Sequence, residues 1–170
     1  MQAPRHKIYN RWLYLSDKEQ EDWLVRANRK FFHKGRLGQI GQLVQKKQAI
    51  IDGANIKTLA AFFCAMGEAA GGPRGYFGFD LLTFHDCCWG GFGLVRGFHL
   101  IWRNHKVSKR HLDNTMLFKY LDSQIRREDY LDEDGLKYLI QHRKEAEAGY
   151  TMYENIIALL HHAEATIEER

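Results

Sequence analysis

Apolar residues recur along this chain at two spacings, which separate predicted strands from predicted helices. Short runs rich in aromatic and β-branched residues predict strands at 8–15, 49–53, 98–102 and 165–168. Apolar positions three and four residues apart predict helices at 17–33, 56–70, 80–89, 107–127, 132–148 and 151–163. Because strands alternate with helices, we predict an α/β protein with a small, mostly parallel sheet packed by helices.

Local signals mark several of the predicted helix ends. Ser16-Asp17-Lys18-Glu19 and Thr151-Met152-Tyr153-Glu154 have the spacing of a capping box, in which two side chains satisfy free backbone donors of the first turn. Gly71-Gly72-Pro73 predicts the end of a helix, and Gly35, Gly38 and Gly41 interrupt the helical pattern near residue 40. We therefore divide the chain into an N-terminal extension at 1–45, made of a strand and a helix, and a main domain at 46–170.

The net charge of +4 is an average over three unlike segments. Residues 1–48 hold 11 Lys and Arg against 4 Asp and Glu, a balance of +7. Residues 49–104 hold 4 of each kind, and residues 105–170 hold 10 against 13, a balance of −3. The N-terminal segment therefore offers a basic surface to partners, and the C-terminal third offers an acidic one.

The basic segment interleaves cations with aromatic residues, as nucleic-acid-binding proteins do. Its cations are Arg5, Lys7, Arg11, Arg26, Arg29, Lys30, Lys34 and Arg36, and its aromatics include Tyr9, Trp12, Tyr14 and Trp23. A short extension also needs large apolar side chains to pack on the main domain, and we favour that role for Trp12 and Trp23. Nucleic-acid binding is therefore the alternative function, not the leading one.

The predicted helix at 80–89 is distinctive because glycine-rich turns bracket it, at 71–78 and 90–93. At 100° per residue, one side of this helix carries Leu81, Phe84 and Cys88, and the other side carries Leu82, Asp86 and Trp89. A carboxylate between large apolar side chains is typical of a protein-contact surface. The alternative is that Trp89 packs under the extension and Asp86 is an ordinary surface acid.

Two chemical alternatives involve the same helix. His85, Cys87 and Cys88 are close in sequence, but structural zinc sites use spaced cysteine pairs, not adjacent cysteines. These residues match no signature of a nucleophilic enzyme, and the preceding glycine-rich turn lacks the lysine of a nucleotide phosphate loop. We predict no catalytic residue, no metal and no cofactor.

Cysteine usage and apolar runs indicate the cellular compartment. The cysteines are Cys64, Cys87 and Cys88, an odd number with two adjacent, which disfavours a disulfide framework. No apolar run approaches the length of a membrane span, and the first residues lack the pattern of a signal peptide. We expect a cytoplasmic protein with no membrane partner.

Motifs follow one another in a distinctive order around the 80–89 helix. Over about 49–104 the order is Ile51-Asp52-Gly53, an apolar helix, Tyr76-Phe77-Gly78, Leu81, Asp86-Cys87 and a following glycine. This order resembles that of the barstar family of ribonuclease inhibitors. The resemblance implies a barstar-like three-stranded parallel sheet at 46–170, with a helical insertion at about 113–149. It also implies a non-catalytic immunity protein that forms a one-to-one complex with a cognate bacterial toxin, a ribonuclease, and plugs its active site.

By the same resemblance, Asp86 matches the family's central acidic anchor, which takes the place of a substrate phosphate. The implied contact residues around it are Tyr76, Phe77, Asp80, Leu82, His85, Trp89 and Gly90. Leu82 stands where the family usually has a second acid, and His85 stands where an aromatic residue is common. These departures imply a more apolar contact or a different toxin.

Overall fold

The computed structural model describes residues 9–38, 43–127 and 132–170, and its centre is a three-stranded parallel sheet. The strands are β1 (Lys46–Asp52), β2 (Leu94–Arg103) and β3 (Thr166–Glu169), in the order β1-β2-β3. Ile50 pairs with Ile101 across β1 and β2, and Leu100 pairs with Ile167 across β2 and β3. The predicted α/β class with a small parallel sheet is confirmed.

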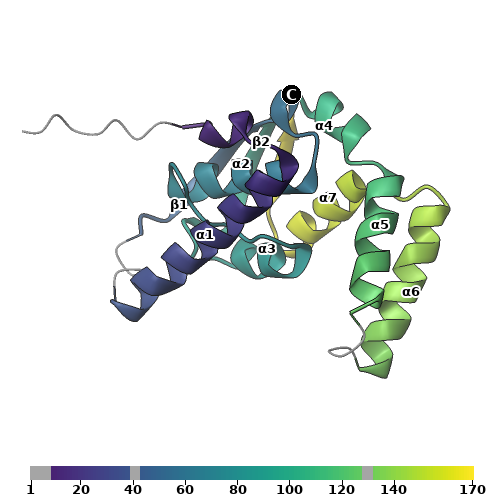
Figure 1. The fold of residues 1–170 in the computed structure, drawn as a ribbon. Coiled ribbons are helices and arrows are strands. Elements are labelled where there is room, and N and C mark those ends of the chain that lie inside the picture. The colour runs from purple at the N-terminus through teal and green to yellow at the C-terminus, as the bar shows by residue number, and fades with distance from the viewer. Residues whose placement is uncertain (1–8, 39–42, 128–131) are drawn as a thin grey trace, which may run out of the picture.

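Helices supply most of the remaining structure (Figure 1). They are α1 (Asp17–Arg36), α2 (Leu59–Gly71), α3 (Leu81–Cys88), α4 (His105–His111), α5 (Asn114–Ile125), α6 (Glu133–Glu147) and α7 (Met152–His162). Both predicted capping boxes form, at the starts of α1 and α7. Helices α5 and α6 lie side by side and project from the body of the molecule. None of the described helices has the length and apolar character that a bilayer crossing requires.

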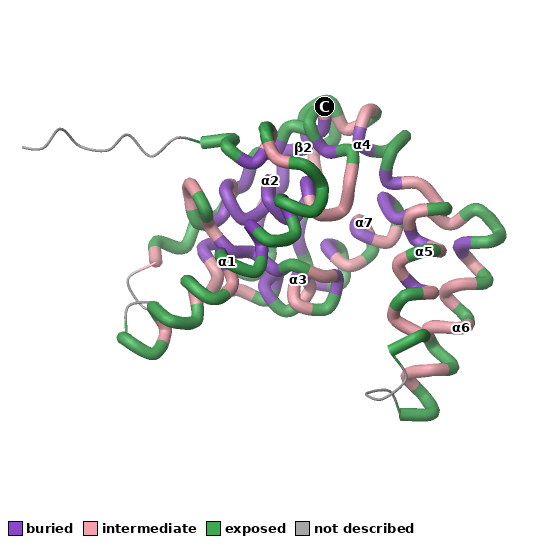
Figure 2. The backbone as a smooth tube through the Cα atoms, viewed as in Figure 1, coloured by how far each residue is buried: buried purple, intermediate pink, exposed green. Residues whose placement is uncertain are grey.

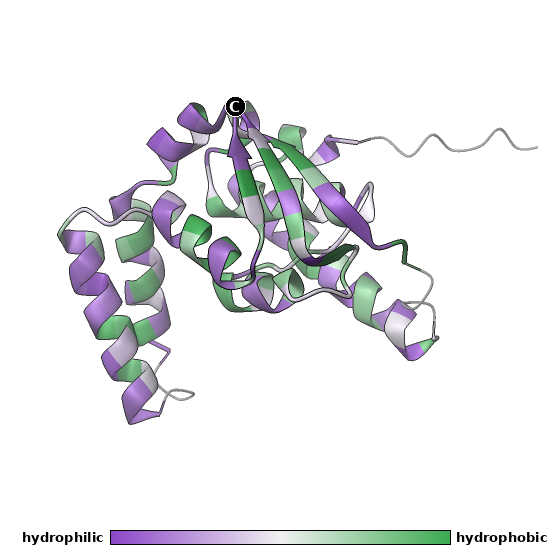
Figure 3. Cartoon of the chain, turned by 180° about the vertical axis from the view of Figure 1, so that it is seen from behind, coloured by the Kyte–Doolittle hydropathy of each residue, from purple (hydrophilic) through white to green (hydrophobic). Residues whose placement is uncertain are grey.

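The core lies between the sheet and the helices on one of its faces. Along β1, Ala49 and Ile51 are buried, whereas Ile50 and Asp52 on the opposite face are exposed. From behind, the strands lie in front of the helices (Figure 3), and the buried backbone gathers around the strands and α2 (Figure 2). Trp102 of the central strand stacks against Phe62 of α2, with ring centroids 5.4 Å apart.

The N-terminal extension packs into this same core. Trp12 and Trp23 are buried with the side chains of α2, which confirms the packing role predicted for both. The carboxylate of Glu68 on α2 accepts hydrogen bonds from the Asn10 backbone N–H at 2.9 Å and from the Trp12 indole N–H at 3.2 Å. Arg5, Lys7 and Gly41, which the sequence placed in the basic surface and linker, lie outside the described residues.

Two predicted elements are wrong. The described part of the predicted strand at 8–15 contains instead a short 3-10 helix, Arg11–Tyr14. The segment does not extend a strand because its Asn10 backbone N–H and Trp12 indole N–H donate to Glu68. The single helix predicted at 107–127 is two helices, α4 and α5, separated at Leu112 and Asp113. There the Asp113 side chain accepts the Met116 N–H and begins a new helix, and the Leu112 carbonyl accepts the Tyr153 N–H of α7 in place of a helical donor.

Candidate protein-contact site

Helix α3 is held in one orientation by its first turn. The Asp80 carboxylate accepts a hydrogen bond from the Thr83 backbone N–H at 2.7 Å, and the Thr83 hydroxyl accepts one from the Asp80 N–H. Gly78 has a φ of +85°, and a Cβ there would lie 2.6 Å from the Phe84 backbone, so only glycine lets the loop approach α3 this closely. The helix therefore presents its outer face with little freedom to reorient.

The inner face of α3 belongs to the core. Leu81, Phe84 and Cys88 are buried, as the helical spacing predicted. The Phe84 ring lies edge-on to Phe62 and to Phe77, at centroid distances of 5.1 and 5.9 Å. This packing leaves the opposite side of the helix to face outward.

The outer face carries an exposed stripe of large side chains around one acid. Leu82, Asp86 and Trp89 are exposed, which confirms their predicted outward orientation and excludes burial of Trp89 under the extension. Phe79, which directly precedes the N-cap Asp80, is also exposed, and sequence reasoning did not single it out because it lies outside the helical pattern. We call Phe79, Leu82, Asp86 and Trp89 the α3 stripe. Its apolar members are 38%, 70% and 39% exposed in that order, too much for ordinary core residues.

The Asp86 carboxylate makes no hydrogen bond or ion pair to any residue that the structure describes. Its backbone carbonyl accepts the N–H of Trp89 at the end of the helix. The side chain is therefore available to a cation from another molecule, with apolar groups on both sides of it.

Four of the other residues implied by the resemblance serve the fold. The side chains of Tyr76 and Phe77 are buried and pack against aromatic rings, so they are not surface contacts. Burial raises the pKa of the Tyr76 hydroxyl above its ordinary value. The Asp80 carboxylate is committed to capping α3, and Gly90, with a φ of +106°, allows the chain to turn after the helix. Of the set, the structure brings Leu82, His85, Asp86 and Trp89 together on one surface.

An ordered cluster surrounds Trp89 at the edge of the stripe. The Arg96 guanidinium of β2 lies over the indole, 4.5 Å from its centroid, and pairs with the Glu164 carboxylate. The His85 and His162 rings each lie edge-on to Trp89, at 5.8 and 5.7 Å. His162 and Glu164 are distant from α3 in sequence, Arg96 lies seven residues after Trp89, and no motif marked the three. Their contacts fix the half-exposed indole in one position.

The two histidines of this cluster share a hydrogen bond. Nε2 of His85 and Nδ1 of His162 are 2.9 Å apart, and the ring planes lie within 24° of each other. Burial lowers the pKa of His85, the neighbouring His162 lowers it further, and Asp86 opposes both. An N–H···N bond needs a lone pair on one ring, so the pair holds while at least one of the two rings is neutral.

The thiols near α3 are not exposed nucleophiles. Cys64, Cys87 and Cys88 are free and buried. Burial raises the pKa of all three, to about 12 for Cys64, so each is a protonated thiol at neutral pH. Within the described ranges, no three His, Cys, Asp or Glu side chains gather as metal ligands would.

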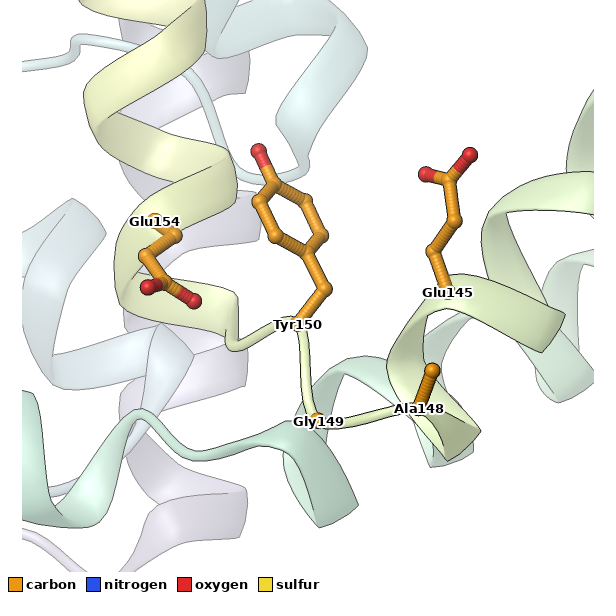
Figure 4. A pocket seen from close by; sticks show the side chains of 5 residues that line it. All are labelled: Glu145, Ala148, Gly149, Tyr150 and Glu154. Atoms are coloured by element: carbon orange, nitrogen blue, oxygen red, sulfur yellow. The ribbon is translucent and has the colours of Figure 1, made fainter.

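Two cavities lie away from α3. One of about 330 Å³ lies between the 3-10 helix, β1 and α2, with Glu68 and Arg103 in its wall. The other, of about 400 Å³, lies where α6 meets α7 and is lined by Glu145, Ala148, Gly149, Tyr150 and Glu154 (Figure 4). Its two carboxylates stand on either side of Tyr150, and that of Glu154 already caps α7 through Thr151. The second cavity has none of the large exposed apolar side chains that the α3 stripe presents.

Comparisons of the chain with protein-family models, with curated proteins and with solved structures find no match.

Proposed function

We propose that this protein is a non-catalytic immunity protein, which binds a bacterial ribonuclease toxin one-to-one in the cytoplasm and covers its active site with α3. The observation that carries the proposal is the α3 stripe, in which an unpaired carboxylate stands among exposed apolar side chains on a rigid helix. The motif order around α3, which resembles the barstar family, supports the class of partner.

The chemistry of the stripe suits a cationic cleft. A ribonuclease active site carries positive groups that hold phosphate, and a carboxylate accepts charge-assisted, often bidentate, hydrogen bonds from arginine. Trp89 and Leu82 would supply apolar area around that contact, and the fixed indole loses little freedom on binding. Asp86 would therefore act as the charged anchor and Trp89 as the aromatic one.

Leu82 shapes the choice of target. It is 70% exposed one helical turn before Asp86, where the family usually presents a second acid. A partner complementary to this surface needs one cationic pocket with an apolar patch beside it, not two cationic pockets. The Glu164 carboxylate near Trp89 is already paired with Arg96, so it adds no second free acid to this surface.

Binding of a barnase-type ribonuclease, and of the protein encoded beside this one, tests the proposal by calorimetry and by cleavage of a fluorogenic RNA. We expect a one-to-one complex that abolishes cleavage. Asp86→Ala should weaken that complex by about 2 kcal/mol or more, because a desolvated charge contact at the centre of an interface is lost. Asp22→Ala is the matched control, since Asp22 is an exposed acid that pairs only with Lys18 on α1 in the described structure.

The two parts of the proposal fail separately. If no ribonuclease toxin forms a complex, the function is wrong. If a complex forms and Asp86→Ala binds as tightly as Asp22→Ala, the function stands and the α3 stripe is not the contact.

A further inference from the structure

The C-terminal half of α1 forms the most one-sided charge distribution in the chain. Between Trp23 and Ile51 the sequence has seven Lys and Arg and no Asp or Glu. The side chains of Arg29, Lys34 and Arg36 form no ion pair or hydrogen bond within the described residues. These cations therefore face solvent without an acidic neighbour on their own helix.

Two of them alternate with apolar residues along the outside of α1. Val25, Arg29, Phe32 and Arg36 follow one another at intervals of four, three and four residues, so they lie along one side of the helix. All four are exposed, and we call them the α1 strip. Trp23, Leu24 and Ala27 occupy the opposite, buried side.

Phe32 is the aromatic member of the strip and is held in place while half exposed. Its ring lies edge-on to Phe31 at 5.5 Å and to the buried Tyr76 at 5.9 Å, with 50% of the residue accessible. A ring in this state offers a fixed apolar face to a flat partner at little ordering cost.

The positions of these cations are not explained by helix stability alone. Positive side chains favour the last turn of a helix, which accounts for Lys34 and Arg36. Arg29 lies two turns earlier, where that effect has faded, and it has no acid three or four residues away. Nor would the strip complement the cationic cleft proposed as the target of α3, because like charges repel.

We infer that the α1 strip binds single-stranded RNA, with Arg29 and Arg36 on phosphates and a base stacked on Phe32. Cations beside an exposed aromatic ring are what such sites use, and an unpaired base has a free face for stacking. A membrane fits less well, because an interfacial helix needs a broad apolar face and the broad apolar face of α1 is buried on the domain.

The test measures fluorescence anisotropy of a labelled oligouridylate of about 12 nucleotides with the full-length protein, from about 50 to about 300 mM NaCl. Arg29→Gln with Arg36→Gln should weaken binding at least tenfold at low salt and reduce the salt slope by roughly 1.4, about 0.7 for each lost contact. Phe32→Ala should weaken binding about fivefold or more with the slope unchanged. Arg110→Gln with Lys119→Gln removes the same charge from exposed sites on α4 and α5 and should change little.

Several results would overturn the inference. The inference is wrong if the anisotropy does not change at low salt, if the α4 and α5 control loses as much affinity as the α1 variant, or if Phe32→Ala loses none. Equally tight binding of polyglutamate would assign the strip to an acidic protein, and binding to phosphatidylserine vesicles without RNA binding would assign it to a membrane. The calorimetric test with the toxin uses no RNA, and the anisotropy test uses no toxin. Either proposal can therefore fail while the other stands.

Discussion

Glu68 and Asp86 are both carboxylates on helices of this molecule, and their surroundings give them opposite roles. Glu68 is 6% exposed and accepts hydrogen bonds from Asn10 and Trp12, so it fastens the extension to α2. Asp86 is exposed and has no partner in the described part of the chain, so its charge is available outside. Residue type and helical position alone would not distinguish the two, because both belong to helices with apolar neighbours.

The buried carboxyl predicts a pH dependence of stability. Burial raises the pKa of Glu68 above its ordinary 4.5, and the hydrogen bonds from Asn10 and Trp12 only partly offset this. The native protein therefore binds this proton more tightly than the unfolded chain does. Lowering the pH through the folded-state pKa towards 4.5 consequently raises the free energy of unfolding.

Urea unfolding of the wild type and Glu68→Gln at about pH 5 and about pH 7.5 measures this effect. The other carboxyls are present in both proteins, so their contribution cancels in the difference between the two free energies of unfolding. We expect the free energy of unfolding of the wild type to rise relative to that of Glu68→Gln at the lower pH. A difference that is constant, or that shifts towards the variant, would contradict the raised pKa.

At the scale of elements, α3 depends on the helical hairpin of α5 and α6. The backbone N–H of Leu81, in the first turn of α3, donates to the Tyr120 hydroxyl of α5 at 3.3 Å. Leu81 is buried and Tyr120 is partly buried, which raises the pKa of the Tyr120 hydroxyl to about 12, so this contact is partly shielded from water. The region that the resemblance left as an insertion thus supports the helix that carries the proposed contact surface.

Tyr120→Phe removes only the hydroxyl and leaves the Leu81 N–H without its acceptor. We expect a loss of about 1 kcal/mol in the free energy of unfolding, with faster hydrogen exchange in the first turn of α3. Tyr138→Phe on α6 is the control, because that ring is 62% exposed and its hydroxyl forms no hydrogen bond among the described residues. Equal stability of the two variants would show that the hairpin does not support α3.

At the scale of the whole molecule, the extension and the main domain share one core. Trp12 is 3% exposed and belongs to the same buried cluster as Phe62 and Trp102. Gln20 of α1 links the parts further, since its side-chain amide donates to the Trp12 carbonyl and its oxygen accepts from Thr58 before α2. We therefore expect the two parts to unfold together.

Trp12→Ala should cost about 3–5 kcal/mol and keep a single unfolding transition. The control is Tyr14→Ala in the same short helix, where the side chain is 90% exposed and its removal should cost less than about 0.5 kcal/mol. Urea unfolding followed by circular dichroism and by hydrogen exchange checks both expectations. Similar costs for the two variants, or separate transitions, would show that the extension is not part of the cooperative unit.

The sequence by itself determined the features that depend on neighbours within a few residues. Capping boxes, the glycine-bracketed α3, and its division into a core side with Phe84 and an outer side with Leu82, Asp86 and Trp89 follow from helical geometry and local hydrogen bonds. The alternation of strands and helices likewise predicted the parallel sheet.

Only the tertiary structure decided which side chains meet across the chain. Arg96 and His162 reach Trp89 from β2 and α7, Tyr76 turns into the core, and Trp12 bonds to Glu68 in place of extending a strand. Most of these contacts join residues far apart in sequence, and whether they form depends on how the helices and the sheet pack together. No local pattern encodes that packing, which is why the outward orientation of Leu82, Asp86 and Trp89 was predictable and the cluster around Trp89 was not.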